Sequence, residues 1–206
     1  MDMRCPVAAR TVMSLFETYA RLSALLSLRS FQFAEPVPGT GMPQHLGFCF
    51  NAEELKKPSK TGEYDCTVLL DLERQEWMSQ VLLELRRQSG ENGLLFPIGY
   101  AELSRLFKRA VLKAGVKVLE PTLYTLRHGG ASHDCGAKVR CRSTIKARGA
   151  WRADSSLRRY EKHGRITLQL RKLPGAVLQA LLRRHSLGEN AFARRCLQPL
   201  RSRAPM

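Results

Sequence analysis

The sequence lacks any segment that could carry the chain into or across a membrane. No part of its 206 residues approaches the roughly 20 consecutive apolar residues that span a bilayer, and residues 1–6 lack the features of a secretory signal. The six cysteines, at positions 5, 49, 66, 135, 141 and 196, include no CxxC pair. These absences predict an intracellular protein with reduced thiols, nuclear in a eukaryote and cytoplasmic or nucleoid-associated in a bacterium.

A metal site is not indicated either. His128, His133, Cys135 and Cys141 lie close together in the sequence, but their spacing matches no common zinc-binding pattern. We therefore expect no metal ion.

Acidic residues are scarce in the second half of the chain. Residues 104–206 contain 24 Lys and Arg but 5 Asp and Glu, a net charge of +19, whereas residues 1–103 contain 10 and 13, a net charge of −3. The chain is 44% hydrophobic and 25% charged, which is typical of a globular domain. The excess favours a polyanionic partner over a basic tail that only aids solubility, because the basic residues alternate with apolar helical positions.

Hydrophobic periodicity predicts a mostly helical chain. Residues 8–28 have a helical pattern with a break near Tyr19 and Ala20, and residues 34–47 form a loop rich in proline and glycine. Thr122 is placed to cap a helix that contains Arg127. Further helices are expected at residues 72–88, 99–114, 139–148, 154–163 and 175–185.

One β-hairpin is predicted among these helices. Residues 54–60 lead into a turn at Thr61 and Gly62, and residues 63–70 alternate in the manner of a strand. Helices with one small sheet define the α+β class. We expect a single, mostly helical α+β domain over residues 1–185 and a basic tail over residues 186–206.

An arginine, a tryptophan and a tyrosine in the basic half suggest phosphodiester chemistry. Trp151 follows Arg127 by 24 residues, and Tyr160 follows Trp151 by nine. A tyrosine hydroxyl forms covalent intermediates when its charge is stabilised, and a guanidinium can bind two phosphate oxygens at once. Their order and spacing predict a site that attacks a phosphodiester.

Two motifs in the first half resemble the catalytic domain of tyrosine recombinases, the phage-integrase family. Residues 18–29 (TYARLSALLSLR) are similar to the family's first arginine box and place Arg21 on its arginine, with Ala24 where glutamate is usual. Residues 59–62 (SKTG) are similar to the hairpin loop that carries the catalytic lysine, here Lys60.

Three motifs in the second half continue the resemblance in the family's order, so that it runs from about residue 10 to about residue 166. The segment YTLRH is similar to the H-x-L-R-H motif, with Arg127 as the second arginine and Tyr124 in place of the first histidine. The segment GAW places Trp151 where the family has a histidine or a tryptophan, and SLRRYEKH places Tyr160 on the nucleophile.

The resemblance implies a role for each matched residue. Tyr160 would attack the scissile DNA phosphate and form a 3′-phosphotyrosyl bond, while Arg21 and Arg127 would bind the non-bridging oxygens. Lys60 would protonate the departing 5′-oxygen, and Trp151 would pack against the phosphate or donate its indole N–H to it.

The resemblance also implies the remaining contacts and the partner. Tyr124 would donate a hydrogen bond, because a phenol with a pKa of about 10 is a poor base at neutral pH. No cofactor is implied, since the phosphotyrosyl bond conserves the energy for religation. The implied partner is double-stranded DNA rather than a membrane, bound by a homotetramer in a full recombinase. Further DNA contacts are expected from His128, Arg158, Arg159 and Lys162.

The family usually has more chain before its first arginine box. It carries a DNA-clamping domain and a helix there, whereas 20 residues precede Arg21 in this sequence. We therefore expect a catalytic domain without that helix and clamp, which would come from a fragment, a truncated gene model or a degenerate copy from a mobile element.

Three functions remain open on the sequence alone. The first is DNA strand exchange in site-specific recombination or integration. The second is a nicking-closing activity like that of type IB topoisomerases, which would use the same Arg, Lys, Arg and Tyr without pairing two DNA sites. The third is a non-catalytic DNA- or RNA-binding module, which Ala24 and Tyr124 favour.

Overall fold

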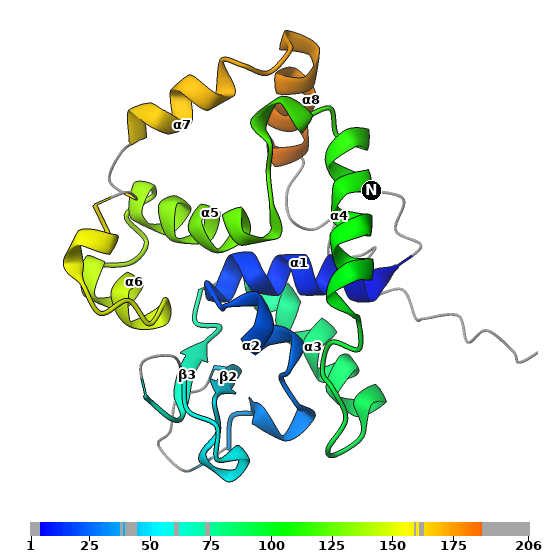
Figure 1. Ribbon diagram of the computed structural model, residues 1–206, viewed down its shortest axis with the longest axis vertical. Helices are drawn as coiled ribbons and strands as arrows, with labels where there is room; N and C mark the ends of the chain where they lie inside the picture. Colours follow the sequence, from blue (N-terminus) through cyan, green and yellow to red (C-terminus); the bar gives the residue numbers. More distant parts are fainter. Residues whose placement is uncertain are drawn as a thin grey trace, which may run out of the picture.

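The structure is a computed structural model that describes residues 5–37, 39, 45–59, 62–72, 75–158, 160 and 163–186. Within these ranges the chain is mostly helical with one small antiparallel sheet, which confirms the predicted α+β class (Figure 1). The α-helices are α1 (Pro6–Thr18), α2 (Leu22–Leu26), α3 (Glu76–Ser89), α4 (Tyr100–Lys113), α5 (Leu123–Gly136), α6 (Arg142–Arg148), α7 (His163–Leu170) and α8 (Gly175–Ser186).

The predicted break in the first helical segment is confirmed. Helix α1 begins with a proline in its first turn and ends at Thr18, because the next residue, Tyr19, has a left-handed φ of 52° that cannot continue the helix. Arg21 then has extended backbone angles and precedes α2. The chain therefore turns sharply just before the first residue expected in the site.

The sheet corrects part of the hairpin prediction. Its strands β1 (Phe33–Ala34), β2 (Gly47–Phe50) and β3 (Cys66–Leu69) pair in that order. Strand β3 lies inside the predicted 63–70, but its partner is β2 and not residues 54–60, which begin in the short 3₁₀ helix Glu53–Leu55. The alternation of β2 buries Phe48 and Phe50, whereas residues 54–60 offer no such apolar pair.

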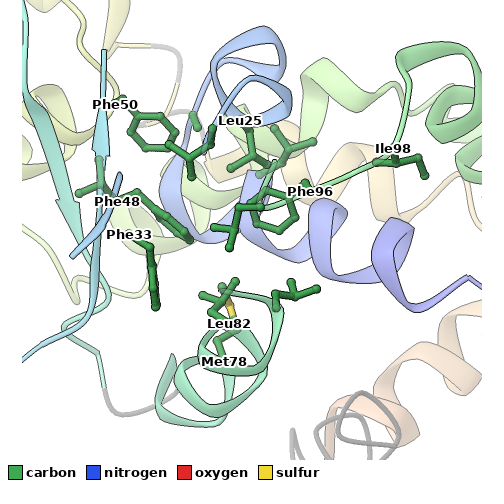
Figure 2. Packing of buried hydrophobic residues seen from close by; sticks show 14 of the residues in the cluster. Leu25, Phe33, Phe48, Phe50, Met78, Leu82, Phe96 and Ile98 are labelled. Carbon is green, nitrogen blue, oxygen red and sulfur yellow. The ribbon is translucent and has the colours of Figure 1, made fainter. Parts of the chain in front are cut away.

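A core of aromatic and aliphatic side chains joins the sheet to the helices of the first half. Phe33, Phe48 and Phe50 of the sheet meet Leu25 of α2 and Phe96 of the segment before α4, and α3 supplies further members of the cluster (Figure 2). This core therefore packs the sheet, α2 and α3 against one another.

Helix α1 connects this core to the second half of the molecule. It lies between α5 on one side and α2 with the sheet on the other (Figure 1). Gly130 of α5 faces it so closely that an added Cβ would lie 1.9 Å from the carbonyl oxygen of Phe16. The absence of a side chain at position 130 therefore lets the two helices cross in contact.

The second half contains most of the helices at the predicted positions, with one correction. Thr122 caps α5, where its hydroxyl accepts a hydrogen bond from the Thr125 amide at 3.3 Å. Residues 154–163 are not the single helix expected: Asp154–Ser156 is a 3₁₀ turn, and α7 begins at His163. An aspartate and two serines in succession favour local turns over an α-helix, because their side chains compete for backbone hydrogen bonds.

Two further predictions concern membrane-spanning helices and the basic tail. No helix in the described ranges is both long and apolar enough to cross a membrane. Residues 187–206, which include nearly all of the expected basic tail, lie outside those ranges.

Candidate functional site

The two arginines expected in the site lie on one pocket. Arg21, at the α1–α2 turn, and Arg127, in the second turn of α5, both line a cavity of about 170 Å³. Ser59 and Glu63, from the loop between β2 and β3, also line the pocket, and the Glu63 side chain is exposed. Gly149, directly after α6, lines it from the second half. Segments from both halves of the chain thus meet at this point.

Arg127 is buried, and no carboxylate of the described residues forms an ion pair with it. Its side chain is 5% exposed, donates a hydrogen bond to the Gly149 carbonyl and lies 4.7 Å from the centre of the Trp151 ring. Burial lowers the pKa of Arg127, and the nearby charge of Arg21 lowers it further. Among the described residues, neither arginine forms an ion pair, so an anion in the pocket would relieve their repulsion.

Trp151 is held against Arg127 by the shape of the preceding turn. The turn bends at Ala150, whose φ is 47°. A Cβ at Gly149 would lie 1.9 Å from the indole ring. Glycine at position 149 is therefore a steric requirement for this position of the tryptophan.

Tyr160 lies beside the same tryptophan. Its ring centre is 5.1 Å from that of Trp151, and its hydroxyl is 2.6 Å from Nδ1 of His128. The phenol is also close enough to Arg127 to affect the pKa of that guanidinium, in the direction opposite to Arg21. The side chain is only 3% exposed, packed with Ile145 and other members of a second apolar cluster.

A buried polar network holds the elements of the site together. The Tyr19 hydroxyl donates a hydrogen bond to Asp134 of α5, and burial together with that carboxylate raises the pKa of the phenol. Arg140 donates to Asp134 at 3.1 Å and to Asp71, just after β3, at 3.0 Å. Arg148 donates to the carbonyls of Leu69 at 2.7 Å and Glu17 at 3.0 Å. Helices α1, α5 and α6 are thereby fixed to the sheet.

The sequence did not reveal this network. Asp134 follows Arg127 by seven residues and therefore lies on the same face of α5, which is the one local signal for it. Nothing local connects it to Tyr19, since the two residues are 115 positions apart in the chain.

Tyr124 stands at the surface rather than in the core. It is 63% exposed, and its ring and that of His128 meet edge to face, with 4.4 Å between ring centres. It lines a second cavity of about 360 Å³, which shares Arg127 and Ala20 with the first.

The other expected site residues fall into two groups. Arg158 is exposed, as a DNA contact requires. Lys60, Arg159 and Lys162 lie outside the described residues. Ser59, the neighbour of Lys60 in sequence, belongs to a turn in which its hydroxyl accepts a hydrogen bond from the Glu63 amide at 3.1 Å.

The residues considered as zinc ligands have other partners. His133 contacts Asp134 at 3.2 Å, and the Cys141 sulfur lies 3.0 Å from the hydroxyls of Ser143 and Thr144. In the part of the chain that the structure describes, no group of three His, Cys, Asp or Glu side chains could hold a metal ion.

Comparison with known proteins identifies no family for this chain. No protein-family model, curated protein or solved structure matches the chain.

Proposed function

We propose that this protein is a tyrosine recombinase-like enzyme that cleaves and rejoins DNA through a 3′-phosphotyrosyl bond at Tyr160. The observation that carries the proposal is the convergence of Arg21 and Arg127 on one pocket without carboxylate partners among the described residues. Trp151 lies against Arg127, and Tyr160 lies against Trp151. Four residues that the family motifs single out thus lie together although they come from distant segments.

The geometry suits the charge changes of phosphoryl transfer. Negative charge grows on the non-bridging oxygens in the transition state, and donors fixed before the reaction stabilise it most. Arg127 is fixed by Gly149 and Trp151, and the α1–α2 turn places Arg21 on the same pocket. Lys60 would supply the proton for the leaving 5′-oxygen, by resemblance to the family's hairpin lysine.

The burial of Tyr160 favours a second candidate, DNA binding without cleavage. A hydroxyl on a side chain that is 3% exposed reaches a phosphate only if the backbone of DNA enters the pocket or the tyrosine moves. In a binding module, the same arginines would hold a phosphate without reaction.

Covalent trapping separates the two candidates. A library of nicked DNA duplexes with randomised sequence would be incubated with the protein, and adducts that survive denaturant would be resolved on a gel. We expect an adduct with wild type, none with Tyr160→Phe, which lacks the attacking oxygen, and an unchanged adduct with Tyr64→Phe, a control at an exposed tyrosine.

The arginines provide the second arm of this experiment. Arg127→Ala is expected to slow adduct formation by about 10²–10³-fold or more, as loss of a transition-state donor does. Absence of any wild-type adduct, with DNA binding intact, would establish the binding module instead. Relaxation of supercoiled plasmid without exchange between two DNA sites would identify a nicking-closing enzyme of the topoisomerase type.

A further inference from the structure

The contact between Tyr160 and His128 assigns a proton acceptor to the proposed reaction. A tyrosine hydroxyl must lose its proton as it attacks phosphorus, and an acceptor for it must lie within hydrogen-bond distance. Nδ1 of His128 is 2.6 Å from the Tyr160 oxygen. We infer that His128 is the general base for Tyr160, an inference that rests on the proposed function.

Residue 124 does not compete for this role. Tyr124 occupies the position where the family motif has its first histidine, but its contact is with the ring of His128, edge to face, at 4.4 Å between centres. A neutral imidazole accepts a proton on its unprotonated ring nitrogen, whereas a phenol keeps its own proton and acts as a hydrogen-bond donor. Tyr124 therefore orients the base, and the base itself lies one helical turn further along α5.

The ring of His128 is positioned from two sides. The ring of Tyr160 lies beside it, with centres 5.7 Å apart and planes 27° apart, and the ring of Tyr124 contacts it at an angle of 78° between planes. The charged neighbour on its own helix is Arg127, and Arg21 faces that arginine from the α1–α2 turn. The base and the phosphate-binding arginines thus lie close together, and Tyr160, which contacts the base, is a member of the second apolar cluster.

The proposed step balances in protons and bonds. The O–H bond of Tyr160 breaks and its proton passes to Nδ1 of His128, while the oxygen forms a bond to the scissile phosphorus. The phosphorus–5′-oxygen bond breaks, and the leaving oxygen takes a proton from Lys60. On rejoining, the 5′-hydroxyl gives its proton back to Lys60 as its oxygen attacks phosphorus. The Tyr160 oxygen leaves and regains its proton from His128.

The direct test replaces His128 by asparagine. His128→Asn keeps a polar atom near the place of Nδ1 but cannot take a proton at neutral pH. We expect DNA binding within about twofold of wild type and the rate of adduct formation on the nicked-duplex library lowered by about 10²–10⁴-fold. His133→Asn makes the same change on the same helix, where the side chain contacts Asp134 instead, and is expected to react at the wild-type rate.

Two further measurements separate base catalysis from a structural role. In His128→Ala, added imidazole should restore part of the adduct rate, because a free imidazole can occupy the emptied space. A substrate with sulfur in place of the leaving 5′-oxygen needs no proton at that atom. The His128→Asn defect should persist in full with that substrate, whereas a role in protonating the leaving group predicts that it disappears.

The outcomes also distinguish this inference from the proposed function. If wild type forms the adduct and His128→Asn forms it at the same rate, His128 is not the base although the enzyme is a strand-cleaving one. If the sulfur substrate rescues His128→Asn, His128 acts on the leaving group and the inference is wrong. If wild type forms no adduct with any duplex, the proposed function fails and this inference fails with it.

Discussion

Glycine at position 149 leaves the space in which the Trp151 ring lies. The Cβ of an alanine there would sit 1.9 Å from the indole ring, so Gly149→Ala must displace either the ring or the turn. We expect a loss of about 1–3 kcal/mol in the free energy of unfolding, the usual range for overpacking, and a weaker hold on Arg127. Urea unfolding and the adduct assay measure the two effects.

The control for this change is Gly99→Ala. No atom lies within 4 Å of a Cβ at position 99, so adduct formation should stay near wild type. Because Gly99 is the N-cap residue of α4, where alanine is less favourable than glycine, stability should fall by about 1 kcal/mol or less. Equal effects of the two substitutions would mean that Trp151 is not held by the steric requirement at position 149.

Tyr124 can be changed with little effect on folding. Because its side chain is 63% exposed, Tyr124→His should alter the free energy of unfolding by no more than about 0.5 kcal/mol. The new side chain is the one usual in the family motif, so adduct formation should be kept or raised. Thermal unfolding and the trapping assay test this, and a protein that unfolds would show that Tyr124 has a structural role that its exposure does not reveal.

At the scale of elements, the crossing of α1 and α5 sets the geometry of the site. Gly130→Ala would place a Cβ 1.9 Å from the carbonyl oxygen of Phe16, and the two helices would have to separate. We expect a loss of about 3 kcal/mol or more, since backbone rather than a flexible side chain is in the way. Chemical denaturation monitored by circular dichroism measures it.

A helical glycine elsewhere gives the matched control. Gly164 of α7 has no atom within 4 Å of an added Cβ, so Gly164→Ala should stabilise the protein slightly, by about 0.5–1 kcal/mol, through the better helix propensity of alanine. A loss of similar size at both positions would contradict the close approach of α1 and α5.

The ionic network between the sheet and α6 should make stability depend on pH. Although burial alone would raise the pKa of Asp71, the hydrogen bonds and charge of Arg140 lower it below the ordinary 3.8. The folded protein therefore binds fewer protons at this carboxyl than the unfolded chain does. Its stabilising contribution is complete above pH of about 4 and is lost as the pH falls through the lowered value.

Asp71→Asn tests this dependence. At neutral pH the variant should be less stable by about 1.5–3 kcal/mol, because Arg140 loses a charged hydrogen-bond partner, and the difference from wild type should shrink in acid. Urea unfolding between about pH 7 and pH 3 measures both curves. A constant difference across that range would mean that Asp71 does not titrate with a lowered pKa.

At the scale of the whole molecule, the charge asymmetry predicts DNA binding that depends strongly on salt. Exposed basic side chains in the described part of the second half include Arg105, Lys108, Arg109, Lys113, Lys117, Lys138, Arg142, Arg152, Arg158, Arg165, Arg171, Lys172 and Arg183. If about 6–10 phosphates are neutralised, affinity should fall by about 10³–10⁵-fold between 50 and 200 mM salt. A filter-binding titration at several salt concentrations measures the slope.

Removing one basic side chain at a time tests how much each contributes to the salt dependence of binding. Arg158→Ala should weaken binding to all duplex sequences alike and reduce the slope by about one if the side chain contacts a phosphate. Salt-independent binding by wild type, or no binding, would exclude nucleic acid as the partner.

The sequence by itself determined the local structure and the charge distribution. The break at Tyr19, the cap at Thr122 and the helices from α3 to α5 follow from apolar periodicity and capping residues, which depend on neighbours a few positions away. The order and spacing of Arg127, Trp151 and Tyr160 could likewise be read directly.

The tertiary structure alone decided which of these residues touch. Periodicity predicts residues 54–60 as the partner strand of residues 63–70, whereas β2 is the partner. Burial of Phe48 and Phe50 depends on a core built from the whole first half, which local periodicity does not reveal. The Tyr160–His128 contact and the Tyr19–Asp134 hydrogen bond join residues 32 and 115 positions apart. Packing of distant segments brings such polar partners together and shields them from water, and no local pattern in the chain encodes that event.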